Sequence, residues 1–259
     1  MALATGVELA VEEFGDGEPV LLLHAWGETH RVFDRLVPLL PSTLHLVVPD
    51  QRGAGESDKP ADGYAMQDGV YDVIALLDAL GLEACWLVGT SSGGYLAQQV
   101  AVDHPERVRG LVLVGAPSNL QRPMPVTFAD LLASFHDPVT RDDMVALNGA
   151  LPLHTPVPDT FFQDQVTAAM TIPTGVLRAT LDGLLAAAPP IQRGPITVST
   201  LILWGAKDDV LPAGQAHELA AAIEGSRLVT YEGTGHLVLW EQPERVALDV
   251  TAFITTPPA

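Results

Sequence analysis

The stretch Cys85-Trp86-Leu87-Val88-Gly89-Thr90-Ser91-Ser92-Gly93 decides how this chain folds. Four apolar residues lead into a Gly-x-Ser-x-Gly turn, and a helix-forming stretch from Tyr95 to Ala101 follows it. A serine at the tip of such a tight turn needs small residues two positions before and after it, because larger side chains would collide there. The turn also places the hydroxyl at a helix N-terminus, where backbone N–H groups favour negative charge. The stretch therefore predicts a strand, a turn that presents Ser91 as a nucleophile, and a helix.

Short apolar segments recur along the chain and alternate with segments of helical length. Most of them are continuous runs, which are typical of parallel strands that helices cover on both faces. Residues 7–14 instead alternate with period two and predict an antiparallel edge strand. We therefore predict an α/β fold in which helices flank about eight mostly parallel strands. The expected strands are 7–14, 19–24, 44–49, 85–89, 111–115, 200–204 and 228–231, and the expected helices are 32–40, 67–80, 92–103, 214–223 and 243–254.

Residues 117–199 interrupt this alternation, because they contain no convincing strand signal. Capping-box patterns or prolines before apolar-periodic stretches predict helix starts near Thr127, Thr140, Pro158 and Pro173. We therefore predict about four helices in 117–199 that form a cap. The cap is inserted between two parts of one α/β core, residues 1–116 and 200–259.

Composition excludes several classes of protein. The 259 residues carry 13 Lys and Arg against 32 Asp and Glu, a formal net charge of −19, which argues against nucleic acid and anionic membranes as partners. A single cysteine, Cys85, excludes an internal disulfide, and its apolar neighbours predict a buried, inert thiol. The N-terminus lacks a secretory signal pattern and no apolar run is long enough to cross a bilayer, so we expect a cytoplasmic protein. The sequence leaves open whether the chain forms a homodimer.

A serine nucleophile needs a base, and the base needs a carboxylate that orients it. His236 follows Gly233-Thr234-Gly235 and the last expected strand, which places it at the carboxyl edge of the sheet, where ligands bind in open α/β folds. His24 also ends an expected strand and competes for the same edge. Ser92 could replace Ser91 as the nucleophile only if the register slipped by one residue.

The loop after the expected strand 200–204 supplies two adjacent candidates for the orienting acid, Asp208 and Asp209. Only one of two neighbouring side chains can face His236. The local residues alone leave both candidates open.

Six motifs, in this order, resemble the α/β-hydrolase family over essentially the whole chain. They are His24-Ala25-Trp26, Asp50-x-Arg52-Gly53-x-Gly55-x-Ser57, Gly89-x-Ser91-x-Gly93, His104-Pro105-Glu106-Arg107-Val108, Gly205-x-x-Asp208 with Pro212, and Gly235-His236 followed by Glu241-x-Pro243. The resemblance implies the α/β-hydrolase fold with a helical cap. It also implies a catalytic triad of Ser91, Asp208 and His236, in the family's chain order, with Asp208 rather than Asp209 as the acid.

The resemblance further implies an oxyanion hole formed by the backbone N–H groups of Trp26 and Ser92. Two positions depart from the family pattern. Ala25 stands where the family usually has glycine, and Thr90 stands where it often has His, Gln or Asn. Neither belongs to the expected triad, but both could change the shape of the pocket.

The implied chemistry is acyl transfer, in which Ser91 attacks a carbonyl carbon and His236 moves the proton. Apolar residues throughout 117–199 predict an apolar pocket for a small molecule, so we expect a small to medium, largely apolar ester or lactone as substrate. No cofactor and no metal are implied. Carbon–carbon bond hydrolases and cofactor-free peroxidases or perhydrolases share the triad and remain an alternative. A ligand-sensing protein on a hydrolase scaffold is a further alternative.

Overall fold

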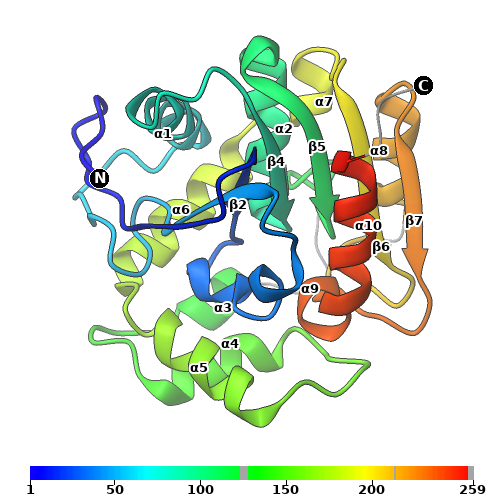
Figure 1. Ribbon diagram of the computed structural model, residues 1–259. Helices are drawn as coiled ribbons and strands as arrows, with labels where there is room; N and C mark the ends of the chain where they lie inside the picture. Colours follow the sequence, from blue (N-terminus) through cyan, green and yellow to red (C-terminus); the bar gives the residue numbers. More distant parts are fainter. Residues whose placement is uncertain (123–127, 213, 256–259) are drawn as a thin grey trace.

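The computed structural model describes residues 1–122, 128–212 and 214–255. Within these residues, seven strands form one sheet, and they are drawn as arrows in Figure 1. The strands lie in the order β1-β3-β2-β4-β5-β6-β7, and β1 alone is antiparallel to its neighbour. Their bounds are β1 Val11–Phe14, β2 Glu18–Leu23, β3 Leu44–Pro49, β4 Cys85–Thr90, β5 Val108–Val114, β6 Ser199–Gly205 and β7 Arg227–Tyr231. The predicted mostly parallel α/β sheet is thereby confirmed, with seven strands where about eight were expected.

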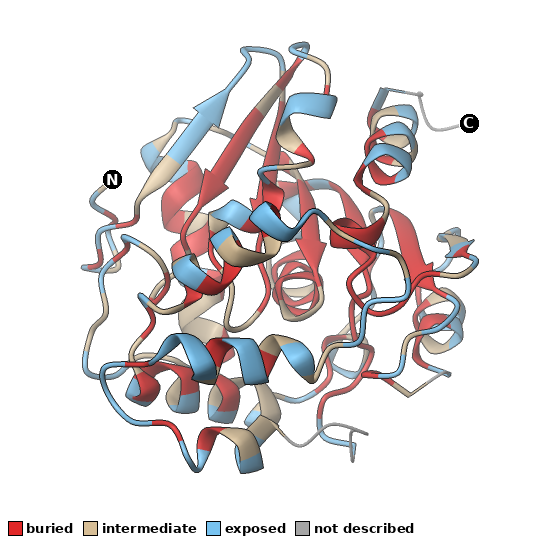
Figure 2. Cartoon of the chain, turned by 90° about the horizontal axis from the view of Figure 1, so that it is seen from below, coloured by how far each residue is buried: buried red, intermediate tan, exposed pale blue. Residues whose placement is uncertain are grey.

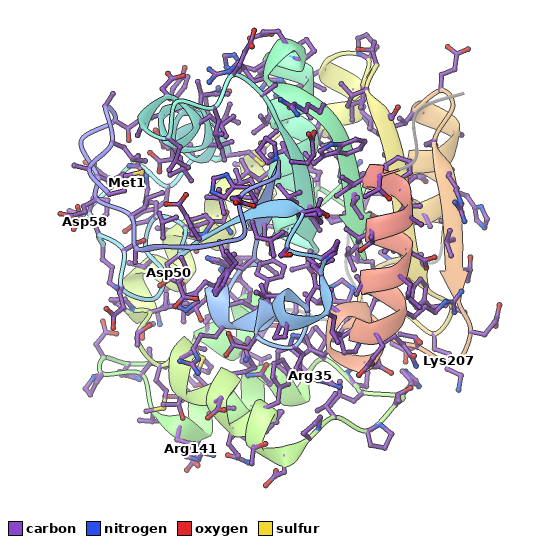
Figure 3. The ribbon with its side chains drawn as sticks, viewed as in Figure 1. Met1, Arg35, Asp50, Asp58, Arg141 and Lys207 are labelled. Carbon is purple, nitrogen blue, oxygen red and sulfur yellow. The ribbon has the colours of Figure 1, made fainter. Side chains whose placement is uncertain are left out.

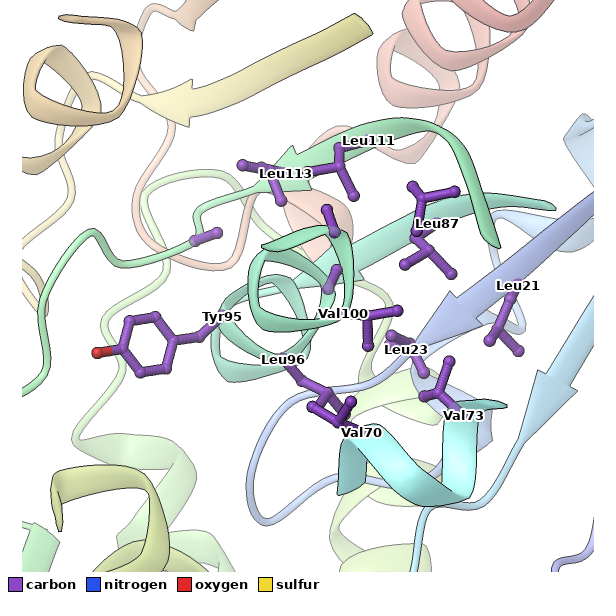
Figure 4. Close-up of a cluster of buried hydrophobic side chains, with 14 of the residues drawn as sticks. Leu21, Leu23, Val70, Val73, Leu87, Tyr95, Leu96, Val100, Leu111 and Leu113 are labelled. Carbon is purple, nitrogen blue, oxygen red and sulfur yellow. The ribbon is translucent and has the colours of Figure 1, made fainter. Parts of the chain in front are cut away.

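Helices cover both faces of the sheet, which explains the continuous apolar runs. In β2, Leu21 and Leu23 point into one core, and Val20 and Leu22 point into the other. The first core packs under α1 Met66–Ala79 and α2 Ser92–Asp103 (Figure 4). Ala216 and Leu219 of α8 Gln215–Ala222 belong to the same core. The second packs under α9 Val238–Glu241 and α10 Pro243–Thr255. Each central strand is therefore apolar on both sides.

The predicted helix at residues 32–40 is wrong. Two short 3₁₀ turns stand there instead, η1 His30–Phe33 and η2 Val37–Leu39. Pro38 has no N–H to donate and disfavours helical backbone at Val37, so an α-helix cannot continue through it. The first strand is also shorter than expected, because only Val11–Phe14 pairs with β3.

Among the described residues of the segment 117–199, called here the inserted segment, the only strand residue is Ser199, with which β6 begins, and the other regular elements are helices. They are α3 Phe128–Leu132, α4 Arg141–Gly149, α5 Asp159–Ala169, α6 Thr174–Ala186 and the single turn α7 Pro190–Arg193, one more than the four expected. Thr140 caps α4 as predicted, whereas Thr127 lies outside the described residues. Helices α3 to α5 lie beyond the carboxyl ends of the strands (Figure 1), and their exposed faces point outward (Figure 2).

The inserted segment rests on the sheet-bearing part of the molecule through close contacts. Arg35, labelled in Figure 3, donates to the carbonyl oxygen of Trp240 at 2.6 Å and lies 5.6 Å from the ring centroid of Phe161 in α5. On α6, Gly183 lies so close to Tyr64 that a Cβ would stand 2.0 Å from the Tyr64 carbonyl oxygen. The segment is thus packed firmly over the strand ends.

The loop after β3 is organised around Asp50 (Figure 3), which is fully buried. Its carboxylate accepts from the backbone N–H and Nδ1 of His30, both at 2.8 Å, and from the N–H of Glu56 at 2.9 Å. Burial opposes ionisation, but these hydrogen bonds hold the pKa of Asp50 well below its usual range. Asp50 therefore joins the two chain segments that follow β2 and β3.

Cys85 is buried, and burial raises the pKa of its thiol to about 12, as expected for an inert residue. Among the described residues, no helix is both long and apolar enough to cross a membrane.

Candidate active site

The turn between β4 and α2 holds Ser91 in a strained conformation. Ser91 has φ 46° and ψ −119°, and it is the only described residue other than glycine with positive φ. A Cβ at Gly93 would lie 2.2 Å from the carbonyl oxygen of Leu23, and one at Gly89 would lie 2.5 Å from that of Gly93. Glycine at these two positions therefore lets the turn approach the neighbouring strand closely enough to project the serine hydroxyl.

Ser91, His236 and Asp208 form one hydrogen-bonded chain at the carboxyl edge of the sheet. Ser91 Oγ lies 3.0 Å from His236 Nε2, and His236 Nδ1 lies 2.8 Å from Asp208 Oδ2. Both the imidazole and the carboxylate are buried, with 5% and 1% of their side chains exposed. With its Nδ1 proton directed at Asp208, the imidazole presents an unprotonated Nε2 that can accept the proton of Ser91.

The two adjacent carboxylates after β6 point in different directions. Asp208 Oδ1 accepts from the N–H groups of Val210 and Leu211, both at 2.9 Å, which leaves Oδ2 for His236. Asp209 instead lies 3.1 Å from His154 Nε2, and 62% of its side chain is exposed. Asp208 is thus the carboxylate that contacts His236.

Glu241 supports the loop that carries His236, and the sequence motif gave it no such role. Its Oε1 accepts from the Gly235 N–H at 2.9 Å. Its Oε2 accepts from the N–H groups of His154 and Thr155 in the inserted segment, at 3.2 and 2.6 Å. One buried side chain therefore ties the histidine loop to the inserted segment.

The two expected oxyanion donors lie side by side, but one of them already has a partner. The Trp26 N–H donates to the Ser92 hydroxyl at 2.7 Å. The Trp26 indole donates to the Leu177 carbonyl oxygen of α6 at 2.9 Å, which fixes the ring against the inserted segment. The hydroxyl of Ser92 is therefore part of the site, although the sequence analysis assigned only its backbone N–H.

Glu28 is a second carboxyl group beside the triad that the sequence analysis missed. Its Oε2 accepts from the Ala25 N–H at 3.0 Å, and its own N–H donates to the Ala25 carbonyl oxygen at 3.2 Å. This pair closes a turn in which Gly27 has φ +75°. Burial raises the pKa of Glu28 to about 7, against the opposing effects of the Ala25 hydrogen bond and nearby His236. An acidic residue just after a strand end was the signal that could have indicated it.

His24, the competing base, is committed elsewhere. Its Nε2 accepts from the Gln51 N–H at 2.9 Å, so its Nδ1 carries the proton that is directed at the Ala25 carbonyl oxygen, also 2.9 Å away. Burial lowers the pKa of His24, in agreement with a neutral ring. Both ring nitrogens are used, so His24 has none left to activate a serine.

Two cavities meet at this edge of the sheet. The smaller, called the serine cavity, has a volume of about 80 Å³ and is lined by Ser91, His236 and residues of the inserted segment such as Leu147 and Leu151. The larger, called the side cavity, has a volume of about 130 Å³ and is mostly apolar. It does not include Ser91 or His236. The two share a lining of Ala25, Trp26, Gly27, Glu28, Ser92 and Leu184.

In the part of the chain that the structure describes, no group of three His, Cys, Asp or Glu side chains is arranged to hold a metal ion.

Comparison with known proteins places this geometry in a family. Residues 18–243 match the family described as the alpha/beta hydrolase fold, and the chain belongs to it. The AB hydrolase superfamily protein YisY of Bacillus subtilis is 29% identical over 267 residues, which cover 95% of each chain. A 2-hydroxymuconate semialdehyde hydrolase of Pseudomonas putida is 30% identical over 97% of this chain and 92% of its own. A solved esterase from Exiguobacterium antarcticum superposes with a TM-score of 0.87, at 25% identity and 98% coverage of both chains. The protein is a hydrolase.

Proposed function

We propose that this protein is a serine hydrolase that cleaves a small to medium, largely apolar ester or lactone through an acyl-serine intermediate. The observation that carries the proposal is the continuous hydrogen-bonded chain from Ser91 through His236 to Asp208. The similarity to an esterase supports the same reaction class. We also propose that the inserted segment, residues 117–199, acts as the cap over the site, with residues 1–116 and 200–259 as the core.

In the proposed reaction, the Ser91 hydroxyl oxygen attacks the carbonyl carbon while His236 Nε2 accepts its proton. Asp208 stabilises the imidazolium that forms. The proton then passes from His236 to the leaving oxygen, the carbon–oxygen bond breaks, and the acyl group remains on Ser91. A water molecule, deprotonated by His236, releases the carboxylic acid and restores the serine.

The negative charge on the substrate oxygen is stabilised by the N–H groups of Ser92 and Trp26. Because the Trp26 N–H is bound to the Ser92 hydroxyl before substrate arrives, it must exchange that partner for the oxyanion. The Ser92 hydroxyl can meanwhile donate its own proton to the same oxygen. Each such donor is worth about 3–4 kcal/mol in the transition state.

The charged side chains that line the two cavities favour an ester or lactone hydrolase over a carbon–carbon bond hydrolase that acts on an acidic substrate. Among the described residues that line the cavities, Arg52 is the only Lys or Arg. Its Nε and Nη2 donate to the Asp72 carboxylate at 2.7 and 2.8 Å, so its charge is already neutralised. A substrate carboxylate would therefore have no free guanidinium to bind, which supports the ester hypothesis despite the similarity to a semialdehyde hydrolase.

The test is a Ser91→Ala variant compared with the unaltered protein on p-nitrophenyl acetate. We expect turnover to fall by at least about 10⁴-fold with an unchanged circular dichroism spectrum. A fluorophosphonate should add one adduct per chain, which mass spectrometry should locate on Ser91 and find missing in the variant. Full activity in folded Ser91→Ala protein would refute the nucleophile. Absence of both ester turnover and a Ser91 adduct would favour the ligand-sensing alternative.

A further inference from the structure

The side cavity borders only the part of the proposed site that holds the expected oxyanion donors. It is lined by Trp26 and Ser92, which supply the expected oxyanion donors, but by neither Ser91 nor His236. The serine cavity contains all four. A ligand group in the side cavity therefore lies next to the oxyanion donors and away from the proton-transferring imidazole.

This placement assigns the two halves of an ester, and the inference rests on the function proposed above. His236 must protonate the leaving oxygen, so the alcohol part has to lie on the imidazole side, in the serine cavity. The carbonyl oxygen has to face the N–H groups of Trp26 and Ser92. The remaining substituent of the carbonyl carbon is the acyl chain, which then extends past these donors. We propose that the side cavity binds the acyl chain of the substrate and makes the enzyme selective for esters of apolar carboxylic acids.

The walls of the side cavity fit an apolar chain. They come from the sheet and from helices on both sides, with Leu23 of β2, Val73 and Leu76 of α1, Leu96 of α2, and Val176 and Leu177 of α6. All six side chains are buried and belong to hydrophobic clusters. Each CH₂ group that enters such surroundings from water should improve binding about fourfold.

Beyond the wall that the two cavities share, the polar side chains of the lining already have partners and offer little to a polar substituent. Arg52 is paired with Asp72, and the Gln51 side-chain amide donates to the His24 carbonyl oxygen at 2.6 Å. The hydroxyl of Thr180 donates to the Val176 carbonyl oxygen of its own helix at 2.7 Å. A hydroxylated or charged acyl chain would lose its hydration here without replacement, so it should be disfavoured.

Three substitutions in the inserted segment test the assignment. Thr180→Phe fills the side cavity from α6, where the hydroxyl bonds only to its own helix. Leu151→Phe fills the serine cavity from a residue that is likewise half-buried. Ala186→Phe adds the same ring at an exposed position of α6 that lines neither cavity and serves as the control.

Two substrate series are measured on each protein. The first is p-nitrophenyl esters from acetate to decanoate, and the second is acetate esters of alcohols from methanol to octanol. In the unaltered protein, kcat/KM should rise about fourfold for each added acyl CH₂ until the cavity is full. Thr180→Phe should lower the ratio of kcat/KM for octanoate over acetate by at least tenfold. Leu151→Phe should alter the alcohol series instead, and Ala186→Phe should alter neither ratio.

The outcomes separate this inference from the proposed function. If Thr180→Phe changes the alcohol series and leaves the acyl ratio intact, the orientation is reversed and the inference is wrong. If neither ratio responds to Thr180→Phe, the side cavity does not hold substrate. In both cases, acetate turnover that depends on Ser91 would still support the serine hydrolase. If the unaltered protein hydrolyses none of the esters, the proposed function itself is refuted.

Discussion

Asp208 and Asp209 are neighbours in the chain, yet only Asp208 contacts His236. We expect Asp208→Asn to lower kcat by about 10³–10⁴-fold, because an amide cannot hold the imidazole in the required tautomer or stabilise its charged form. Asp209→Asn removes only a largely exposed contact to His154, so kcat should stay within about threefold. Steady-state kinetics on one activated ester measures both variants. A large loss in Asp209→Asn beside near-normal activity in Asp208→Asn would reverse the assignment.

Several contacts of single side chains in the site could not be predicted from the sequence. Spacing alone left Asp208 and Asp209 equal, and only the family motif favoured Asp208, because the direction of a side chain depends on the loop it belongs to. The bond from the Trp26 N–H to the Ser92 hydroxyl spans 66 positions and depends on a side-chain rotamer. Glu28 likewise acquires its role from its contact with Ala25 and from burial, neither of which a local pattern encodes.

Helix α6 contains two glycines in opposite surroundings. A Cβ at Gly183 would lie 2.0 Å from the Tyr64 carbonyl oxygen and 3.2 Å from the Cα of Ala65, whereas one at Gly175 would meet no atom within 4 Å. We expect Gly183→Ala to lower the free energy of unfolding by about 1–3 kcal/mol, because the helix must move away from the core. Gly175→Ala should raise it by up to about 1 kcal/mol through helix propensity.

Urea unfolding of the two variants and the unaltered protein measures this difference. The pair is matched, because both substitutions add one methyl group to the same helix. Equal effects of the two substitutions would show that α6 does not rest closely on Tyr64. A loss of ester turnover confined to Gly183→Ala would further indicate that the position of α6 shapes the site.

Elements with strong patterns were predictable and elements broken by proline were not. The central strands follow from apolar runs, and α1 and α2 begin and end within one residue of the predicted ranges. Residues 32–40 carry apolar residues at helical spacing, yet Pro38 divides them into two 3₁₀ turns. The periodicity there reports which side chains are buried, since Val32, Phe33 and Leu36 all lie in the core, and not which backbone conformation buries them.

The parallel sheet of the folded molecule explains why residues that are distant in the sequence meet. Strands β4 and β6 end at the same edge, so the loops that follow them carry Ser91 and Asp208 to one place, and the loop after β7 brings His236 there. That meeting could be predicted from strand order alone. The two cavities could not, because they depend on how the inserted segment packs over this edge, and its helices have no partner strand to set their register.

The stability of the molecule should depend on pH through Glu28. Its pKa is raised from 4.5 to about 7 by burial, so between these values the unfolded chain releases a proton that the folded chain keeps. The folded state is therefore penalised as pH rises, and this cost is complete above about pH 7. In Glu28→Gln the amide oxygen can still accept from the Ala25 N–H, but the ionisation is gone. The unfolding free energy of the variant minus that of the unaltered protein should therefore increase by about 2 kcal/mol when the pH is raised from 5 to 8.

Urea unfolding at both pH values, with and without 0.5 M NaCl, separates this effect from general charge repulsion. The chain carries a net charge of −19, and repulsion among surface carboxylates also weakens the folded state as pH rises. Salt screens those exposed charges, whereas the cost of ionising Glu28 comes from an enclosed position and persists. The difference between variant and unaltered protein should therefore be nearly the same at both salt concentrations. A difference that vanishes in salt, or that does not change with pH, would show that Glu28 ionises freely in the folded protein.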